Sequence, residues 1–240
     1  MKKLTIITAS VVAAACSWAG QGDIVPSVGL VHFDGQDVNT YYNYLAAVPV
    51  FRFWDAARLT EAPLLSDGAP IANEDGVAAS RLVVVGNAPE SKVDEVRAAY
   101  GVAAENTATL DGNVPSVAAE LAGNWARARD VVVAPYAPGG DKDAVASASY
   151  AAALASAINA PLLYTYTKRA PYETLSALRR LGAKNVYVVD FGRTCDEEVI
   201  ARIGAEGRNL GRRFARPGEV DSFVDTHLRQ SENKNLPREA

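Results

Sequence analysis

The chain has 240 residues, of which 49% are hydrophobic and 22% are charged, and its formal net charge is −4. This length is enough for one large or two small domains, and the composition is too apolar for an intrinsically disordered chain. The acidic balance gives no general attraction to nucleic acid, so we predict no nucleic-acid partner.

The first residues have the features of a secretion signal. Lys2 and Lys3 precede a largely apolar run at 4–15, and Ser17-Trp-Ala19 fits a signal-peptidase site. The run is too short to be retained as a membrane-spanning helix. We therefore predict a signal peptide at 1–19 and an exported protein.

A second cleavage site overlaps the first. Ala13-Ala-Ala-Cys16 is similar to a lipoprotein signal, in which Cys16 becomes the lipidated first residue of the mature chain. In the other interpretation, Cys16 is removed with the signal peptide. We expect membrane attachment only if Cys16 is lipidated.

Two stretches of the remaining chain resemble each other. Ala-Pro-Leu-Leu at 62–65 recurs at 160–163, 98 residues later, and Arg-Leu-Val-Val-Val-Gly at 81–86 resembles Asn-Val-Tyr-Val-Val-Asp at 185–190. A period near 100 residues is too long for a solenoid and suits a duplicated α/β unit. We expect the boundaries of these parts to follow the duplication: a first unit at 20–128, a second at 129–230 and a frayed tail at 231–240.

Strands and helices alternate along both expected units. Short apolar runs predict buried strands at 28–33, 63–65, 82–85, 131–133, 162–166 and 186–189, with weaker strands at 107–110 and 209–214. Helical patterns cover 91–100, 116–127, 144–158 and 171–181, and another helix starts near 194. This alternation predicts parallel, doubly wound sheets in two tandem Rossmann-like units, with a partial third closing piece at the end.

Local signals predict where some of these helices begin and end. Ser91 with Asp94 and Thr194 with Glu197 are expected to cap their helices, and Gly182 is expected to end the helix at 171–181. The segment 71–80 has too little apolar surface to form a good helix.

Acidic loops follow the first strand of each unit. Asp34 and Asp37 lie in one loop, and Asp141 and Asp143 lie in the other. Because ligands of such sheets bind at the carboxyl ends of the strands, these side chains could bind a cation or a sugar, or act as acid and base. The alternative is that Asp37 and Asp143 cap the helices that follow.

A cluster of arginines precedes the end of the second unit. Guanidinium groups pair well with phosphate and carboxylate, so such a cluster could bind an anionic polymer. The alternative is an ordinary solvated surface. The five arginines are Arg202, Arg208, Arg212, Arg213 and Arg216.

The sequence contains no complete motif for catalysis, nucleotide binding or metal binding. His32 is expected to be buried and hydrogen-bonded. Cys195 has no partner at ligand spacing, and either its thiol pKa is lowered at a helix start or it is a small residue at the helix entrance. We therefore predict no metal, no cofactor and no enzymatic activity.

The stretches 157–163 and 173–189 resemble the cell wall-binding repeat type 2 family, most specifically in Leu-Gly-Ala-Lys-Asn-Val-Tyr-Val-Val at 181–189. Modules of that family are Rossmann-like, usually occur in sets of three on exported proteins, and hold them to anionic wall polymers. Two features of that family are absent. The Gly-Gly loop that usually follows a strand is replaced by Gly-Asn at 86–87 and by Asp-Phe-Gly at 190–192. The Arg-Tyr-x-Thr-Ala entry to the linking helix is replaced by Val-Pro-Ser-Val-Ala-Ala at 114–119.

The resemblance implies a non-catalytic protein of the cell wall or cell surface, whose partner is an anionic cell wall polymer or an envelope protein. The residues alone also allow an exported solute-binding protein or a hydrolase that uses the strand-end Asp loops.

Overall fold

The computed structural model describes residues 24–25, 27–55 and 58–235. The signal peptide expected at 1–19, with Cys16, and the last part of the expected tail, 236–240, lie outside these residues. None of the described helices is long and apolar enough to cross a membrane.

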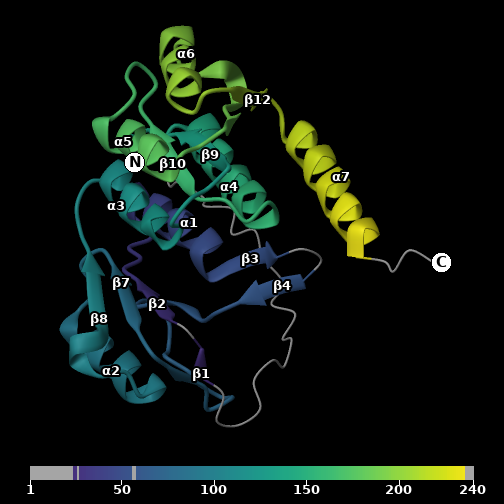
Figure 1. Ribbon diagram of the computed structural model, residues 1–240. Helices are drawn as coiled ribbons and strands as arrows, with labels where there is room; N and C mark the ends of the chain where they lie inside the picture. The colour runs from purple at the N-terminus through teal and green to yellow at the C-terminus, as the bar shows by residue number, and fades with distance from the viewer. Residues whose placement is uncertain (1–23, 26, 56–57, 236–240) are drawn as a thin grey trace, which may run out of the picture.

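Two parallel four-stranded sheets form the framework, as the alternation of strands and helices predicts (Figure 1). The first has the order β5-β2-β7-β8, and the second has the order β10-β9-β11-β12. If the four strands of each sheet are counted in chain order, the second strand lies at one edge in both sheets, and the first, third and fourth strands follow it. The strands are β2 (Val28–Val31), β5 (Leu64–Ser66), β7 (Leu82–Val85), β8 (Thr107–Leu110), β9 (Asp130–Pro135), β10 (Leu162–Thr165), β11 (Asn185–Val189) and β12 (Leu210–Phe214).

Backbone hydrogen bonds, like the strand order, are repeated between the two sheets. The N–H of Gly86, after β7, donates to the carbonyl of Leu110 at 2.8 Å, and the N–H of Asp190, after β11, donates to that of Phe214 at 2.9 Å. Both partners are shifted by 104 residues. The two sheets are thus built to one plan, and the last two strands of each share their register except for a shift between Val186 and Tyr187 in the second sheet.

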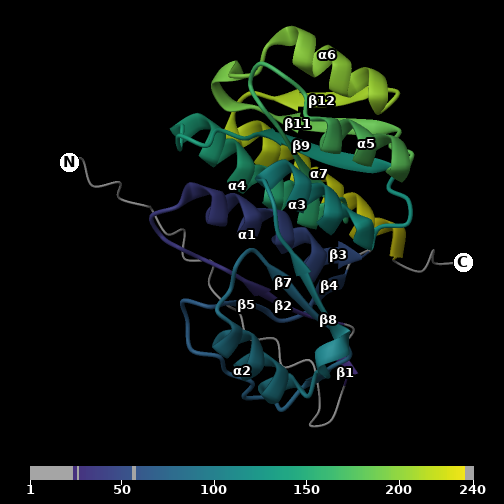
Figure 2. The ribbon, with the colours of Figure 1, turned by 90° about the vertical axis from the view of Figure 1, so that its left-hand side faces the viewer.

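Helices cover both faces of each sheet (Figures 1 and 2). Helices α1, α3 and α4 lie between the two sheets, α7 packs beside α4, α2 covers the outer face of the first sheet, and α5 and α6 cover the outer face of the second. Their bounds are α1 (Val38–Phe51), α2 (Glu90–Tyr100), α3 (Val114–Leu121), α4 (Lys142–Ala157), α5 (Tyr172–Leu181), α6 (Glu197–Glu206) and α7 (Pro217–Asn235).

The largest hydrophobic cluster lies between the sheets and joins the two halves of the chain. Alternate side chains of a strand point to opposite faces, so Val83 of β7 and Val132 of β9 face this inner layer, whereas Val84 and Val133 face the outer helices. Tyr42 is fully buried at this junction. The core therefore holds the two sheets together as one body.

Two small pairs of strands were not predicted. After α1 the chain forms an antiparallel hairpin of β3 (Arg52–Asp55) and β4 (Arg58–Glu61), and β1 (Ile24–Val25) pairs in parallel with β6 (Ala78–Ala79). The segment 67–77 contains no helix, as its lack of apolar surface indicates.

Several predicted boundaries were wrong. Neither Ser91 nor Thr194 caps a helix, because α2 begins after Pro89 and α6 after Asp196, both without a side-chain cap bond. The helix expected at 116–127 is the shorter α3, followed by a 3-10 turn at Ala122–Asn124. Gly182 does end α5, with a left-handed φ of 66°.

The last helix, α7, extends into the expected tail. It continues to Asn235 and so includes the first half of the segment predicted to be frayed.

Candidate functional site

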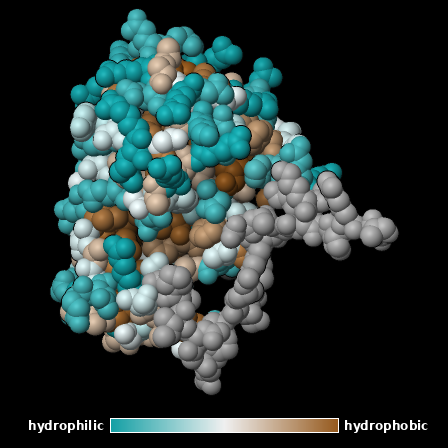
Figure 3. All heavy atoms as spheres, in the orientation of Figure 1, coloured by the Kyte–Doolittle hydropathy of each residue, from teal (hydrophilic) through white to brown (hydrophobic). Residues whose placement is uncertain are grey.

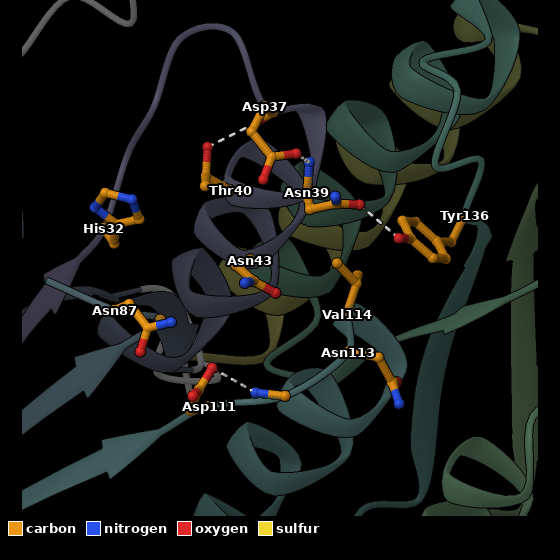
Figure 4. Close-up of a pocket in the computed structure, with 12 residues that line it drawn as sticks. His32, Asp37, Asn39, Thr40, Asn43, Asn87, Asp111, Asn113, Val114 and Tyr136 are labelled. Atoms are coloured by element: carbon orange, nitrogen blue, oxygen red, sulfur yellow. Dashed lines mark hydrogen bonds between the residues drawn. The ribbon is translucent and has the colours of Figure 1, made fainter.

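A polar pocket of about 420 Å³ lies at the carboxyl ends of the first sheet (Figure 4). The ends of β2, β7 and β8, the first turns of α1 and α3, and the residue after β9 form its walls. Its position follows the general rule for ligand sites of open parallel sheets, and its volume lies within the range of about 300–1,000 Å³ for small-molecule sites. The polar side chains that line it include His32, Asn39, Asn43, Asn87, Asp111 and Tyr136.

Helix α1 supplies one wall of the pocket. Residues three or four apart lie on one face of a helix, which brings Asn39, Thr40 and Asn43 to the pocket side. Asp37 also lines the pocket, and its Oδ1 accepts a bond from the N–H of Asn39 at 2.9 Å. The predicted Asp37 is therefore both a pocket residue and the cap of α1.

A hydrogen bond between the units closes the far side of the pocket. The hydroxyl of Tyr136 donates to Oδ1 of Asn39 at 2.5 Å (Figure 4). The pocket thus needs both units, because Tyr136 belongs to the second.

Asn43 is the most unusual residue of the pocket. Asn43 is only 8% exposed, yet its buried Oδ1 has no hydrogen-bond partner among the described residues. Figure 4 shows it in the middle of the lining residues. Such an unpaired buried group costs about 1–3 kcal/mol, so its presence calls for an explanation.

His32 is not buried as predicted. Because β2 ends at Val31, its side chain is 34% exposed at the edge of the pocket. Its Nδ1 lies 2.6 Å from Oδ2 of Asp67, whose other oxygen accepts a bond from the N–H of Phe33. Asp67 was missed because it lies 35 residues away on a loop without a motif.

The other acidic residues of the predicted loops do not line this pocket. Asp141 caps α4 by accepting a bond from the N–H of Ala144 at 3.0 Å, so the prediction that Asp143 is the cap was wrong. Oδ1 of Asp34 accepts from the N–H of Gln36 within its own loop. In the described part of the chain, no group of three or more His, Cys, Asp or Glu side chains could hold a metal ion.

The predicted arginines do not form one uniform cluster. The N–H groups of Arg213 donate to the buried Oδ2 of Asp190 at 2.7 Å and to Glu197 at 2.6 Å, and its side chain is only 12% exposed. Neighbouring side chains of a strand point to opposite faces, so Arg212 lies on the other side of β12, over the ring of Phe214 at 4.9 Å.

The remaining arginines are exposed. Arg202, Arg208, Arg212 and Arg216 lie at the surface around β12, and none of the four has an ion-pair partner within 4 Å among the described residues. Hydrophilic side chains dominate the upper part of the face in Figure 3, over α5, α6 and β12. Four of the five predicted arginines are therefore exposed, whereas Arg213 is built into the fold.

Cys195 is not an activated thiol. Its residue is 3% exposed, and burial raises its pKa to about 12, with the nearby Asp190 adding to the shift. The helix start does not lower the pKa, so the interpretation as a small buried residue is the better one.

Comparison of the sequence with known protein families finds no match, and comparison with curated proteins finds none either. The fold is similar to two solved cell wall proteins of Clostridium difficile. Cwp8 matches with a TM-score of 0.58 and 15% identity over 90% of this chain and 34% of that protein. Cwp6 matches with a TM-score of 0.61 and 16% identity over 85% of this chain and 32% of that protein.

The chain thus spans about a third of the length of these two proteins. At such low identity the likeness establishes the fold alone.

Proposed function

We propose that this protein is an exported, non-catalytic module of the cell surface that binds an anionic polymer of the cell wall. The observation that carries the proposal is the shared fold of this chain and the two cell wall proteins, over 90% and 85% of its length. The predicted signal peptide at 1–19 and the resemblance of 181–189 to a cell wall-binding repeat point the same way. An envelope protein is the second candidate partner.

The exposed arginines around β12 are the proposed contact surface. The acidic neighbours Glu197 and Glu206 are paired with Arg213 and Arg179, and Glu206 also interacts electrostatically with Arg202. Arg208, Arg212 and Arg216 have no ion-pair partner within 4 Å among the described residues. Exposed arginines suit phosphate or carboxylate groups of a polymer, which they can bind with paired N–H donors.

The alternative of a solute-binding protein or hydrolase that uses the acidic loops is not favoured. Asp141 serves as a helix cap, and Asp34 accepts a hydrogen bond within its own loop. Asp143 lies against Gly192, so that a Cβ added at Gly192 would lie 2.8 Å from Oδ2 of Asp143. Of these four acidic residues, Asp37 lines the pocket described above.

Sedimentation of the mature chain with isolated cell walls tests the proposal. We expect binding to untreated walls and loss of binding to walls stripped of their anionic polymers. The variant Arg208→Ala with Arg212→Ala should bind more weakly, and Lys92→Ala with Arg97→Ala on α2 serves as a control of equal charge change. Equal binding to stripped and untreated walls would contradict the proposal.

A further inference from the structure

The internal duplication allows the pocket of the first unit to be compared with the same place in the second. An offset of 104 residues relates α1 to α4 and the end of β7 to the end of β11. Asn43 therefore corresponds to Ser147, and Asn87 corresponds to Phe191.

In the second unit this place is filled. Ser147 is fully buried, and its hydroxyl oxygen accepts a bond from the N–H of Phe191 at 2.8 Å and donates to the carbonyl of Asp143 at 2.6 Å. Phe191 is 5% exposed and starts a short 3-10 turn that ends at Arg193. Every polar atom of Ser147 has a partner, and the turn leaves it no access to solvent.

In the first unit the same place borders the pocket. Asn87 is exposed instead of folding inward, and Asn43 keeps a buried Oδ1 for which the described residues supply no donor. Since the same fold satisfies this position in the second unit, the unpaired oxygen is a property of the first unit and not of the architecture. A hydroxyl group of a bound ligand would supply the missing donor.

The charges of the pocket restrict the ligand. Two acidic side chains line it, Asp37 and Asp111, and neither lysine nor arginine does. His32 also lines the pocket and is held at Nδ1 by the carboxylate of Asp67, while the hydroxyl of Tyr136 donates to Asn39. The two carboxylates disfavour an anion, and among the described residues no group of three or more His, Cys, Asp or Glu side chains could hold a metal ion.

The uncharged groups offer both donors and acceptors. Oδ1 of Asn39 is occupied by the hydroxyl of Tyr136, which leaves the NH2 group of Asn39 as a donor, while Oδ1 of Asn43 is an acceptor. Asn87 adds a third amide at the rim. Alternating donors and acceptors in a pocket without net attraction for ions suit the hydroxyl groups of a sugar ring.

We propose that this pocket binds a neutral saccharide unit, with a sugar hydroxyl donating to Oδ1 of Asn43. The site goes beyond the proposed polymer contact, because it lies in the first unit and not at the arginines of β12.

The test is a titration of the mature chain, followed through the side-chain amide signals of asparagine in 1H–15N NMR spectra. The probes are glucose, mannose, galactose and N-acetylglucosamine, with glucose 6-phosphate and Ca2+ as charged controls. We expect at least one neutral sugar to shift the amide signals of Asn39, Asn43 and Asn87 in a saturable way below about 10 mM.

Two variants and a control make the test specific to the pocket. Asn43→Ala removes the unpaired acceptor, and Asn87→Phe introduces the side chain that fills the second unit. Each of these two variants should weaken sugar binding about tenfold or more. The control variant Asn209→Ala, at an exposed residue of the second unit, should leave sugar binding unchanged.

Three results would overturn the proposal: no saturation with any neutral sugar, unchanged binding by both pocket variants, or tighter binding of glucose 6-phosphate or Ca2+ than of every neutral sugar. Because the probes are free sugars, a failure here is distinct from a failure of the chain to bind cell walls.

Discussion

The guanidinium group of Arg213 lies 2.7 Å from Oδ2 of Asp190, and Asp190 is fully buried. The same carboxylate accepts bonds from the N–H groups of Thr194 and Cys195. Asp190 therefore fixes the turn between β11 and α6, and Arg213 neutralises the charge that this arrangement buries.

Loss of Arg213 should destabilise the fold strongly. Arg213→Ala leaves the buried carboxylate of Asp190 without its cation, and we expect a loss of about 3–5 kcal/mol in the free energy of unfolding. Arg212→Ala on the opposite face of β12 should cost no more than about 1 kcal/mol, the strength of an exposed cation–π contact. Urea denaturation measures both, and equal losses would show that Arg213 is an ordinary surface residue.

Asn43 and Ser147 should respond to substitution in opposite ways. Asn43→Leu removes a buried polar atom that has no partner, so the free energy of unfolding should stay the same or rise by about 1–2 kcal/mol. Ser147→Ala removes the acceptor of the N–H of Phe191 and should lower it by about 1–3 kcal/mol.

Thermal or urea unfolding of the two variants decides the point. A loss for Asn43→Leu as large as that for Ser147→Ala would mean that Asn43 has a structural partner after all.

Cys195 should react slowly in the native state. Because burial raises its pKa to about 12, almost none of it is thiolate near neutral pH. Labelling with iodoacetamide at pH 8 should be slow in native protein and fast in urea. Fast labelling of the native protein would contradict the burial of the thiol.

The same shift predicts a loss of stability at high pH. The folded state holds the proton of Cys195 more tightly than the unfolded chain, whose thiol pKa is about 8.5. The stabilisation is complete below that value and is lost as the pH rises towards about 12. Unfolding free energies of wild type and Cys195→Ala should therefore converge or cross between these pH values, and parallel curves would count against the shift.

Gly29 should not tolerate a side chain. A Cβ at this position would lie 2.7 Å from Cδ1 of Leu64 and 2.8 Å from the ring of Phe51. Gly29→Ala should cost about 1–3 kcal/mol by overpacking. Gly123→Ala, which meets nothing within 4 Å, should change stability by about 0.5 kcal/mol or less, and an equal effect of both substitutions would refute the close packing.

The strands could be predicted because both faces of each sheet are covered. Runs such as 82–85 and 186–189 are continuously apolar, and such runs identify buried parallel strands without any knowledge of the partners. Helix starts were less predictable. Thr194 has the sequence of a cap, but its hydroxyl donates to Asp190, which directly follows β11. Only the tertiary structure shows this bond.

The candidate pocket was only partly predictable. Asp37 was found because it follows the first strand, the place where such sheets bind ligands. Asn43 and Asn87 carry no motif, and Tyr136 comes from the other unit, 97 residues from its partner Asn39. The comparison of Asn43 with Ser147 could have been made from the duplication, but the sequence does not tell which of the two positions is left unpaired.

The arginines show the same limit of prediction from the sequence. The sequence places Arg212 and Arg213 together, whereas the alternation of the strand separates them into an exposed residue and a partner of a buried carboxylate. A polymer-binding test must therefore leave Arg213 intact.

The salt dependence of cell wall binding tests the account most directly. Exposed arginine contacts are screened by salt, so the affinity of the mature chain for isolated walls should fall steeply as the ionic strength rises. Each exposed contact contributes only about 0.2–1 kcal/mol, and Arg208→Ala with Arg212→Ala should flatten the dependence without unfolding the protein. No binding to walls at low salt, or binding that is independent of salt and of these arginines, would contradict the account.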